Sequence, residues 1–425
     1  MRNKKFLSVL LVGALTIGIL GGCGNREIPT EETSNTTQQE KLVPEENAKL
    51  KFWVASGKLD YGKAVGAAFE KEYGVPVEVE EQSIDIINKM TLDAPAGNGA
   101  DVFMAAHDLF LTARDSGILA ELNPNVEKVV REEANEIAVK TVEDDGKLYG
   151  VPVSIECYAL LYNKDLVKGE PATTMEQIAE EAKEYNNPKE NKFWFLTIPT
   201  EGYPAFPYLS VDGFQPFGPD GKDNDNPGFD TPEFEKGLQR IADLKEIIPI
   251  KGADLKMETI TQLEQNFKDG KTAYYPIGPW LIKSLKEEKI NFGVTTLPTW
   301  DGKQLKTMAG VQNAYVSSYS KYPNAAQLFA QYLISKEGAS ILYKEAYNVT
   351  ARKNVDDIEG LKDDAELKVF VESFKDAVPM PQVKRVSYYW TVLQGMLKSV
   401  FDHDLTPQDA AKKAQEDFEA LVASE

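Results

Sequence analysis

The 425-residue chain has very few of the side chains from which proteins build metal sites and redox centres. It contains two histidines, His107 and His403, and two cysteines, Cys23 and Cys157. This scarcity excludes His-rich metal sites, zinc ribbons and thioredoxin-like pairs, so we expect no cofactor. Basic residues are also in deficit, 47 against 67 acidic ones, and the negative charge excludes nucleic acid as a partner.

The chain also lacks a comfortable membrane span at its start. The apolar run Phe6 to Leu20 is short, follows basic residues and ends in small ones, which predicts a signal peptide over residues 1–22. Leu20-Gly21-Gly22-Cys23 resembles a bacterial lipobox, which implies that Cys23 is acylated, with palmitate among the acyl chains. The alternative is a signal peptide with an incidental cysteine. Acylation would place the protein on the extracellular face of the cell membrane.

Large apolar side chains are nearly absent from residues 24–47, which are rich in Thr, Glu, Gln and Asn. Such a segment cannot repay the entropy of ordering, so we predict a lipidated cysteine and a disordered tether over residues 23–47. If Cys23 is acylated, Cys157 has no partner for an intramolecular disulfide. The remaining chain must then be stabilised by its hydrophobic core alone. The sequence is 42% hydrophobic, which is enough to form such a core.

From residue 48 onward, strand and helix patterns alternate, which is typical of an α/β fold. The first five segments are predicted as strand, helix, strand, helix and strand, at 49–54, 61–73, 75–80, 83–92 and 101–106. Such units form parallel sheets that bind ligands beyond the carboxyl ends of their strands. Those ends are the turns that contain Lys58 and Asp108.

A second α/β region follows Tyr158, so the length and pattern predict two or three domains or lobes. Helices are predicted to begin after Thr173 or Thr174, at Thr231-Pro232 and at Thr406-Pro407, where a capping residue is present. The strand predicted at 271–277 is followed by Gly278-Pro279-Trp280, which places Trp280 at another carboxyl end.

Two segments match nucleotide-binding or metal-binding motifs only in part. Asp269 to Thr272 resembles the end of a phosphate loop but lacks the leading glycine, and Asp223 to Gly228 begins like a calcium loop but lacks its later ligands. With two histidines a catalytic triad has few candidates, and we predict that His107 packs or forms a hydrogen bond.

Six segments, in order and spacing, resemble the bacterial maltose/maltodextrin-binding proteins, which are solute-binding components of ABC importers. The segments are Leu50 to Val54, Ala100 to Val102 with Ala106 to Asp108, Gly117 to Leu122, Leu161 to Leu166, Gly278 to Trp280, and Met380-Pro381 before Tyr389-Trp390. The similarity runs from about residue 48 to the end.

The resemblance implies a two-lobed, type II periplasmic-binding-protein-like fold in which each lobe is a sheet flanked by helices. The lobes would comprise residues 48–157 with 309–360, the N-lobe, and residues 158–308 with 361–425, the C-lobe. It further implies a monomer that binds a maltodextrin in the cleft between the lobes and delivers it to the membrane subunits of an ABC permease.

The resemblance also implies the ligand-binding residues, which are polar groups for sugar hydroxyls and indoles for the C–H faces of pyranose rings. They are Lys58, Asp108 and Glu156 on one lobe, Glu201 and Tyr203 on the other, the aromatic platforms Trp280 and Trp390, and Gln394 where the family has an arginine.

Each of the main candidates also has a structural alternative. Lys58 could stand in an exposed turn, Trp280 and Trp390 could belong to the core, and Glu156 and Glu201 could form structural salt bridges.

Three further positions depart from the family pattern. Gly57 and Leu109 replace polar contacts and Ala105 replaces a third platform. The expectation remains a maltose- or maltodextrin-type oligosaccharide, with a longer, branched or cyclic maltodextrin, or another oligosaccharide, as the alternatives to maltose itself. Tyr61 and Phe110 are the candidates for replacing the missing platform.

The function predicted from the resemblance is capture without chemistry, so we expect no enzyme activity. A secreted glycoside hydrolase is an alternative, because paired carboxylates and aromatic platforms also describe its site. A binding protein for a non-sugar solute such as a polyamine is another.

Overall fold

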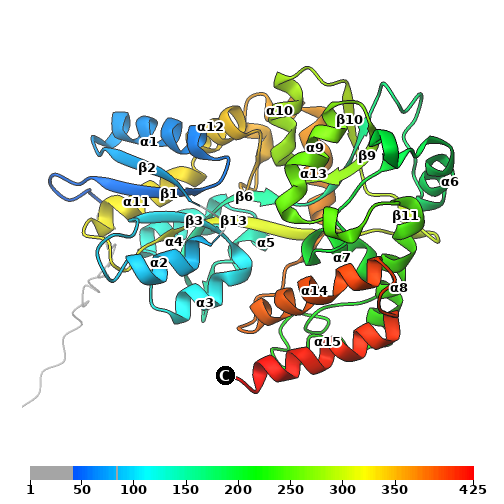
Figure 1. Cartoon of the computed structure of the whole chain (residues 1–425). Helices are drawn as coiled ribbons and strands as arrows, with labels where there is room; N and C mark the ends of the chain where they lie inside the picture. The colour runs from blue at the N-terminus through cyan, green and yellow to red at the C-terminus, as the bar shows by residue number, and fades with distance from the viewer. Residues whose placement is uncertain (1–41, 83–84) are drawn as a thin grey trace, which may run out of the picture. The chain divides into compact units, whose positions relative to one another are not determined.

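The computed structural model describes residues 42–82 and 85–425 (Figure 1). The described residues belong to one compact unit. The predicted leader and Cys23 lie outside the described residues. Residues 42–47, the end of the predicted tether, are described, and Glu45 accepts hydrogen bonds from the backbone N–H groups of Asn324 and Ala325 at 2.7 and 3.1 Å.

The first of two main sheets has seven strands and defines the N-lobe. Its order is β14 (Val349–Thr350), β6 (Gly150–Glu156), β13 (Met308–Val316), β3 (Val102–Ala106), β1 (Leu50–Ala55) and β2 (Val77–Gln82), and β15 (Val378–Pro379) pairs with β13. Strands β2, β1 and β3 are parallel, as predicted, whereas β13 runs antiparallel to both β3 and β6. No local pattern predicted that antiparallel strand.

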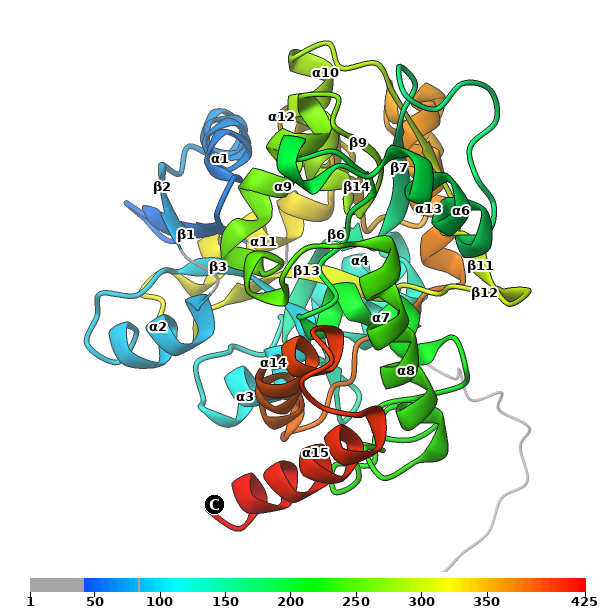
Figure 2. The same cartoon turned by 45° about the vertical axis from the view of Figure 1, so that its right-hand side comes forward.

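Helices cover the N-lobe sheet and bury its apolar side chains (Figures 1 and 2). They are α1 (Leu59–Tyr73), α2 (Ile86–Asp93), α3 (Phe110–Asp115), α4 (Pro124–Glu133), α5 (Glu136–Lys140), α11 (Pro323–Ile334) and α12 (Lys336–Ala346). The predicted stop of α1 is confirmed, because Gly74 adopts the left-handed conformation with φ 70°.

The second main sheet has four strands and defines the C-lobe. Its order is β10 (Phe292–Thr295), β7 (Ala159–Asn163), β9 (Thr272–Ile277) and β8 (Phe193–Phe195). The helices around it are α6 (Met175–Tyr185), α7 (Gly202–Ser210), α8 (Pro232–Ile247), α9 (Ile260–Lys268), α10 (Ile282–Glu287), α14 (Val386–Phe401) and α15 (Pro407–Val422). The side chains of Thr174, Thr231 and Thr406 cap α6, α8 and α15, so these predicted helix starts are confirmed.

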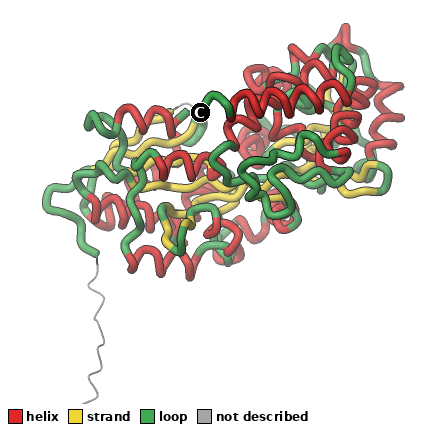
Figure 3. Tube along the Cα trace, turned by 90° about the horizontal axis from the view of Figure 1, so that it is seen from below, coloured by secondary structure: helices red, strands yellow, loops and turns green. Residues whose placement is uncertain are grey.

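Two stretches of chain pass between the two main sheets. Strand β6 continues through Cys157 and Tyr158 into β7, and the chain returns from β10 into β13. In addition, β15, from the predicted C-lobe segment 361–425, pairs with the start of β13 at Met308 and Ala309. Helix α13 (Ala365–Lys375) contacts strands of both sheets. Seen from below, strands run through the middle of the body with helices on either side (Figure 3).

Among residues 42–82 and 85–425, no helix combines the length and apolar character needed to span a membrane.

Candidate functional site

The three residues predicted on the N-lobe follow the carboxyl ends of its strands. Lys58 lies in the turn after β1, Asp108 in the short 3₁₀ helix His107–Leu109 after β3, and Glu156 is the last residue of β6. Strands β1 and β3 are parallel neighbours, and β13 joins β3 to β6. The sheet topology therefore brings the three side chains to one edge of the sheet.

Lys58 is 9% exposed, so the alternative of an exposed turn residue is wrong. Burial lowers the pKa of the Lys58 ammonium, and the nearby Glu156 carboxylate partly offsets this effect. Glu156 accepts a hydrogen bond from the Gln312 amide at 3.1 Å. Within the described ranges, no lysine or arginine nitrogen lies at salt-bridge distance from Glu156 or Glu201, which disfavours the structural ion pairs considered for them.

Asp108 meets the C-lobe directly through Trp390 on α14. The indole Nε1–H of Trp390 donates a hydrogen bond to Asp108 Oδ2 at 3.2 Å. Burial raises the pKa of Asp108, and the bond from Trp390 lowers it by a smaller amount. This bond joins the lobes across the predicted groove and links a predicted platform to a predicted hydroxyl acceptor.

Trp280 and Tyr203 are linked through a ring that sequence reasoning missed. Tyr158, in the crossing stretch between β6 and β7, packs edge to face against both of them, with ring centroids 5.8 Å from Trp280 and 5.3 Å from Tyr203. The Tyr203 hydroxyl donates to the backbone carbonyl of Met308 at 3.2 Å. No periodicity signals this role for Tyr158, because it depends on where the chain crosses between the lobes.

Glu201 precedes α7, and the Met257 backbone and the Gln394 amide favour the charged form of its carboxyl, which partly offsets the effect of burial on its pKa. Burial raises the pKa of the Glu201 carboxyl. Gln394 lies one turn beyond Trp390 on α14, so the predicted pair of Glu201 and Gln394 is brought together beside that platform.

Both predicted platforms pack against the core without being fully buried in it. Trp280 and Trp390 are partly exposed, in contrast to the core residue Trp53, which is 1% exposed. Each indole lies against a glycine: a Cβ on Gly202 would come within 2.8 Å of the Trp390 ring, and one on Gly278 within 1.9 Å of the Trp280 ring. These two glycines therefore make room for the rings.

The two residues considered as replacements for the missing platform are both buried. Tyr61 and Phe110 are each 1% exposed, and Phe110 stacks on Tyr315 inside the N-lobe. Tyr61 is therefore packed inside the N-lobe, and the little surface that Phe110 exposes lies away from the eight predicted residues, none of which shares a cavity with it. The chain therefore offers Trp280, Trp390 and Tyr203 as the partly exposed aromatic surfaces of the predicted site.

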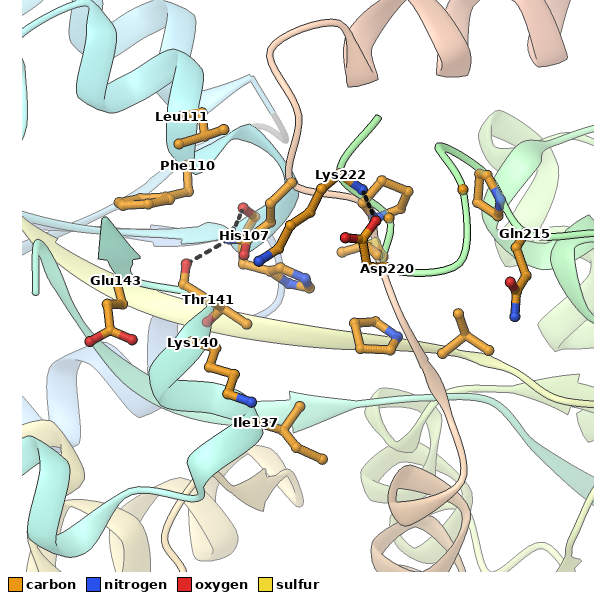
Figure 4. A pocket seen from close by; sticks show the side chains of 18 of the residues that line it. His107, Phe110, Leu111, Ile137, Lys140, Thr141, Glu143, Gln215, Asp220 and Lys222 are labelled. Atoms are coloured by element: carbon orange, nitrogen blue, oxygen red, sulfur yellow. Dashed lines mark hydrogen bonds between the residues drawn. The ribbon is translucent and has the colours of Figure 1, made fainter. Parts of the chain in front are cut away.

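A cavity of about 830 Å³ lies at a different place, and none of the eight predicted residues lines it. Phe110 and Leu111 face it from the N-lobe, and Gln215, Asp220 and Lys222 from a loop of the C-lobe (Figure 4). No tryptophan or tyrosine is among the described residues that line it. Phe110 is the aromatic carbocycle among the described residues that line it, and this ring is 1% exposed.

His107 lines that cavity and has the structural role predicted for it. It is 1% exposed, and its Nδ1 accepts a hydrogen bond from the Val311 backbone N–H at 3.1 Å. Burial lowers the pKa of His107 to about 4, so the imidazole is neutral at pH 7. Residues 42–82 and 85–425 contain no group of three or more His, Cys, Asp or Glu side chains arranged to hold a metal ion.

A comparison with protein families decides the class of molecule. Residues 64–369 match the model of the family described as bacterial extracellular solute-binding protein. The chain belongs to this family. Its members are solute-binding proteins, not enzymes.

The chain is also similar to individual proteins over nearly its full length. It is 27% identical over 99% of its length to the maltooligosaccharide ABC transporter solute-binding lipoprotein of Streptococcus pneumoniae strain R6, of which the alignment covers 98%. It is 28% identical over 98% of its length to the galactooligosaccharide-binding protein of Bacillus subtilis, of which 97% is covered.

A crystal structure of a cyclo/maltodextrin-binding protein in complex with maltotetraose is similar with a TM-score of 0.75. The sequence identity is 30%, and the match covers 89% of this chain and 98% of that protein. The two-lobed α/β fold predicted from the sequence is therefore confirmed.

Proposed function

We propose that the protein captures maltodextrin-type oligosaccharides outside the cell and delivers them intact to an ABC importer. The observation that carries the proposal is the meeting of acidic and aromatic side chains from both lobes, above all the bond between Asp108 and Trp390. Carboxylates can accept hydrogen bonds from neighbouring sugar hydroxyls, and indoles offer apolar area to pyranose faces. The similarity to proteins named for maltodextrins supports the same ligand class.

The proposed ligand-binding residues are the eight predicted from the sequence. Lys58, Asp108 and Glu156 would bind hydroxyls from the N-lobe, made of residues 48–157 and 309–360. Glu201, Tyr203, Trp280, Trp390 and Gln394 would bind from the C-lobe, made of residues 158–308 and 361–425.

We also propose that Cys23 is acylated after removal of residues 1–22 and anchors a monomer to the cell membrane. The lipobox-like sequence supports this, as does the word lipoprotein in the name of the pneumococcal relative. Mass spectrometry of protein extracted from membranes should find acyl chains on an N-terminal Cys23. An unmodified cysteine would contradict the anchor.

Calorimetric titration of the purified protein tests the ligand class. Maltotriose, maltotetraose and a cyclodextrin should bind with dissociation constants near the micromolar range, about −8 kcal/mol, whereas spermidine should not bind. Galactotriose belongs in the panel because the galactooligosaccharide-binding relative is as similar as the maltooligosaccharide one. Tight binding of galactotriose alone would replace maltodextrin with galactooligosaccharide as the ligand.

The variant Trp280→Ala should weaken maltodextrin binding at least tenfold, because it removes a stacking surface worth more than about 1.4 kcal/mol. Its circular dichroism should match that of the wild type. Trp194→Ala is the matched control, since Trp194 packs on Tyr185 and Tyr274 within the C-lobe and belongs to no part of the proposed groove. Unchanged affinity of Trp280→Ala would remove Trp280 from the site.

Incubation with maltoheptaose separates capture from hydrolysis. The sugar should be recovered at full length after prolonged incubation with stoichiometric protein. Shorter products would contradict the proposal in favour of a glycoside hydrolase.

A further inference from the structure

A second contact joins the lobes through helix α10, which begins directly after the Trp280 turn. The Lys283 ammonium on α10 donates a hydrogen bond to the backbone carbonyl of Glu345 at 2.7 Å. Glu345 lies in the last turn of α12, on the N-lobe. The same ammonium is 3.9 Å from the Asp60 carboxylate, in the first turn of α1.

The carbonyl of Glu345 is a favourable acceptor for a cation. The last four carbonyls of a helix lack intrahelical donors, and partial negative charge accumulates there. Tyr347 closes α12 in the left-handed conformation with φ 50°, and its N–H is bonded to the carbonyl of Tyr343, not of Glu345. The Lys283 side chain is 28% exposed, so solvent screens this interaction only in part.

A second lysine on α10, Lys286, adds a contact with the same end of α12. Lys286 lies 2.6 Å from the Asp364 carboxylate, whose side chain is 3% exposed, and 5.2 Å from the centroid of the Tyr347 ring. Asp364 also accepts from the Tyr343 hydroxyl at 3.3 Å. Helix α10 is therefore linked to the C-terminal end of α12 through Lys283 and Glu345 and through Lys286 and Tyr347.

The contacts of Lys283 depend on how the two lobes meet. Lys283 follows β9 of the C-lobe sheet, whereas Asp60 and Glu345 lie on helices packed on the N-lobe sheet. Opening the lobes would separate these partners, so the contact stabilises the closed arrangement relative to an open one. Lys283 belongs to none of the eight positions proposed to bind sugar.

We propose that Lys283 is a positioning residue that sets the closing equilibrium of the lobes, so that it raises the affinity for every closing ligand by one common factor without contacting the ligand. The inference rests on the proposed function. It adds a determinant of affinity that lies outside the groove. Apparent affinity depends on the population of the binding-competent state, so a change in that population multiplies all dissociation constants equally.

The test compares Lys283→Met with Lys344→Met. Both variants lose one positive charge beside the C-terminal turn of α12, but Lys344 belongs to α12 itself and is exposed. Lys283→Met should raise the dissociation constants of maltotriose, maltotetraose and maltoheptaose by the same factor, about fivefold, mainly through faster dissociation. Lys344→Met should bind all three sugars like the wild type.

Three calorimetric outcomes would overturn the inference. Unchanged affinity of Lys283→Met would show that the contact does not favour closure. A loss that differs among the three sugars would show that Lys283 contacts the ligand. An equal loss in Lys344→Met would assign the effect to net charge.

A measurement without ligand separates this inference from the proposed function. Dyes on Lys71→Cys in α1 and Lys236→Cys in α8, both exposed positions on different lobes, report closure by single-molecule energy transfer. Lys283→Met should lower the closed fraction about fivefold, and Lys344→Met should not. An unchanged closed fraction overturns the inference, whereas failure of the wild type to bind any maltodextrin overturns only the proposed function.

Discussion

At the scale of single residues, three charged groups of the proposed groove have pKa values displaced toward their neutral forms. Burial lowers the pKa of Lys58 and raises those of Asp108 and Glu201. Each group is therefore less favourably placed in the folded chain, when charged, than it would be in water. Displaced pKa values are concentrated at functional sites. Ligand binding there requires charged groups whose burial lowers the stability of the fold.

Asp108→Asn should make the fold more stable at pH 7 and weaken sugar binding at least tenfold. Because the pKa of Asp108 is raised on folding, its contribution to stability is present at low pH and is lost as the pH rises through the folded pKa. The stability gain of the variant should therefore shrink as the pH falls below that pKa. Urea midpoints at pH 7 and pH 4, with a sugar titration, measure both effects.

Asp115→Asn is the control of opposite sign. The ammonium of Lys384 is the largest cause that lowers the pKa of Asp115, so this carboxylate stabilises the fold at pH 7 and its removal should lower the urea midpoint. A loss of stability in Asp108→Asn at pH 7 would contradict the account of Asp108 as a strained binding group.

How far the sequence predicts the site depends on the kind of residue. Lys58, Asp108 and Trp280 follow strands that can be recognised locally, so it is predictable that each lies at the carboxyl edge of its own sheet. Gln312 and Tyr158 were not predicted, because their roles arise from β13 and from the crossing stretch, which pair segments far apart in the chain.

At the scale of elements, local signals predict where helices start and stop better than how strands pair. A threonine at each N-cap of α6, α8 and α15 bonds a backbone N–H within the first turn, which needs no distant partner. By contrast, β13 pairs with β3, β6 and β15, which lie in three separate parts of the chain. The residues at which the chain passes from one lobe to the other are therefore predicted by the family resemblance and by no local pattern.

The C-lobe contains an ion cluster that ties α8 to a small hairpin. Asp212, with a side chain 8% exposed, accepts from Arg240 Nε on α8 at 2.8 Å and from Lys303 Nζ on β12 (Lys303–Gln304) at 2.5 Å. Arg240 also bonds Asp301, between β11 (Thr299–Trp300) and β12, at 2.7 Å. The Arg240 guanidinium is the largest cause that lowers the pKa of Asp212 to about 2.

Asp212→Asn should destabilise the fold by roughly 2 kcal/mol at pH 7, since about 1.4 kcal/mol corresponds to each unit of lowered pKa. The contribution of Asp212 is present above the unfolded pKa and is lost as the pH falls toward 2. The difference between variant and wild type should therefore narrow in acid, as measured by urea unfolding at pH 7 and pH 3.

Asp243→Asn on α8 serves as the control for that measurement. Asp243 accepts only from the exposed Gln239 amide one turn away, so its replacement should change stability by less than about 0.5 kcal/mol. An equal loss in both variants would contradict the role assigned to the cluster.

At the scale of the whole molecule, the two lobes are coupled by shared strands and by contacts across the proposed groove. Strand β13 belongs to the N-lobe sheet, but its first residue, Met308, falls within the proposed C-lobe and accepts a hydrogen bond from Tyr203 of that lobe. The bond between Trp390 and Asp108 joins the lobes directly. Length and the alternation of strands and helices predict more than one lobe, but neither predicts this coupling.

Because the lobes are coupled, we expect the protein to unfold in one thermal transition. Bound sugar should raise the midpoint temperature of that whole transition. A ligand held by residues of both lobes and bound only by the folded chain stabilises it by about 2.7 kcal/mol at 100 times its dissociation constant. Scanning calorimetry with increasing maltotetraose should show a single transition that shifts upward, and Trp280→Ala should shift less at the same sugar concentration. If there are two transitions and sugar raises the midpoint temperature of only one of them, the ligand is bound by a single lobe. A lobe that does not contact the ligand is not stabilised by it.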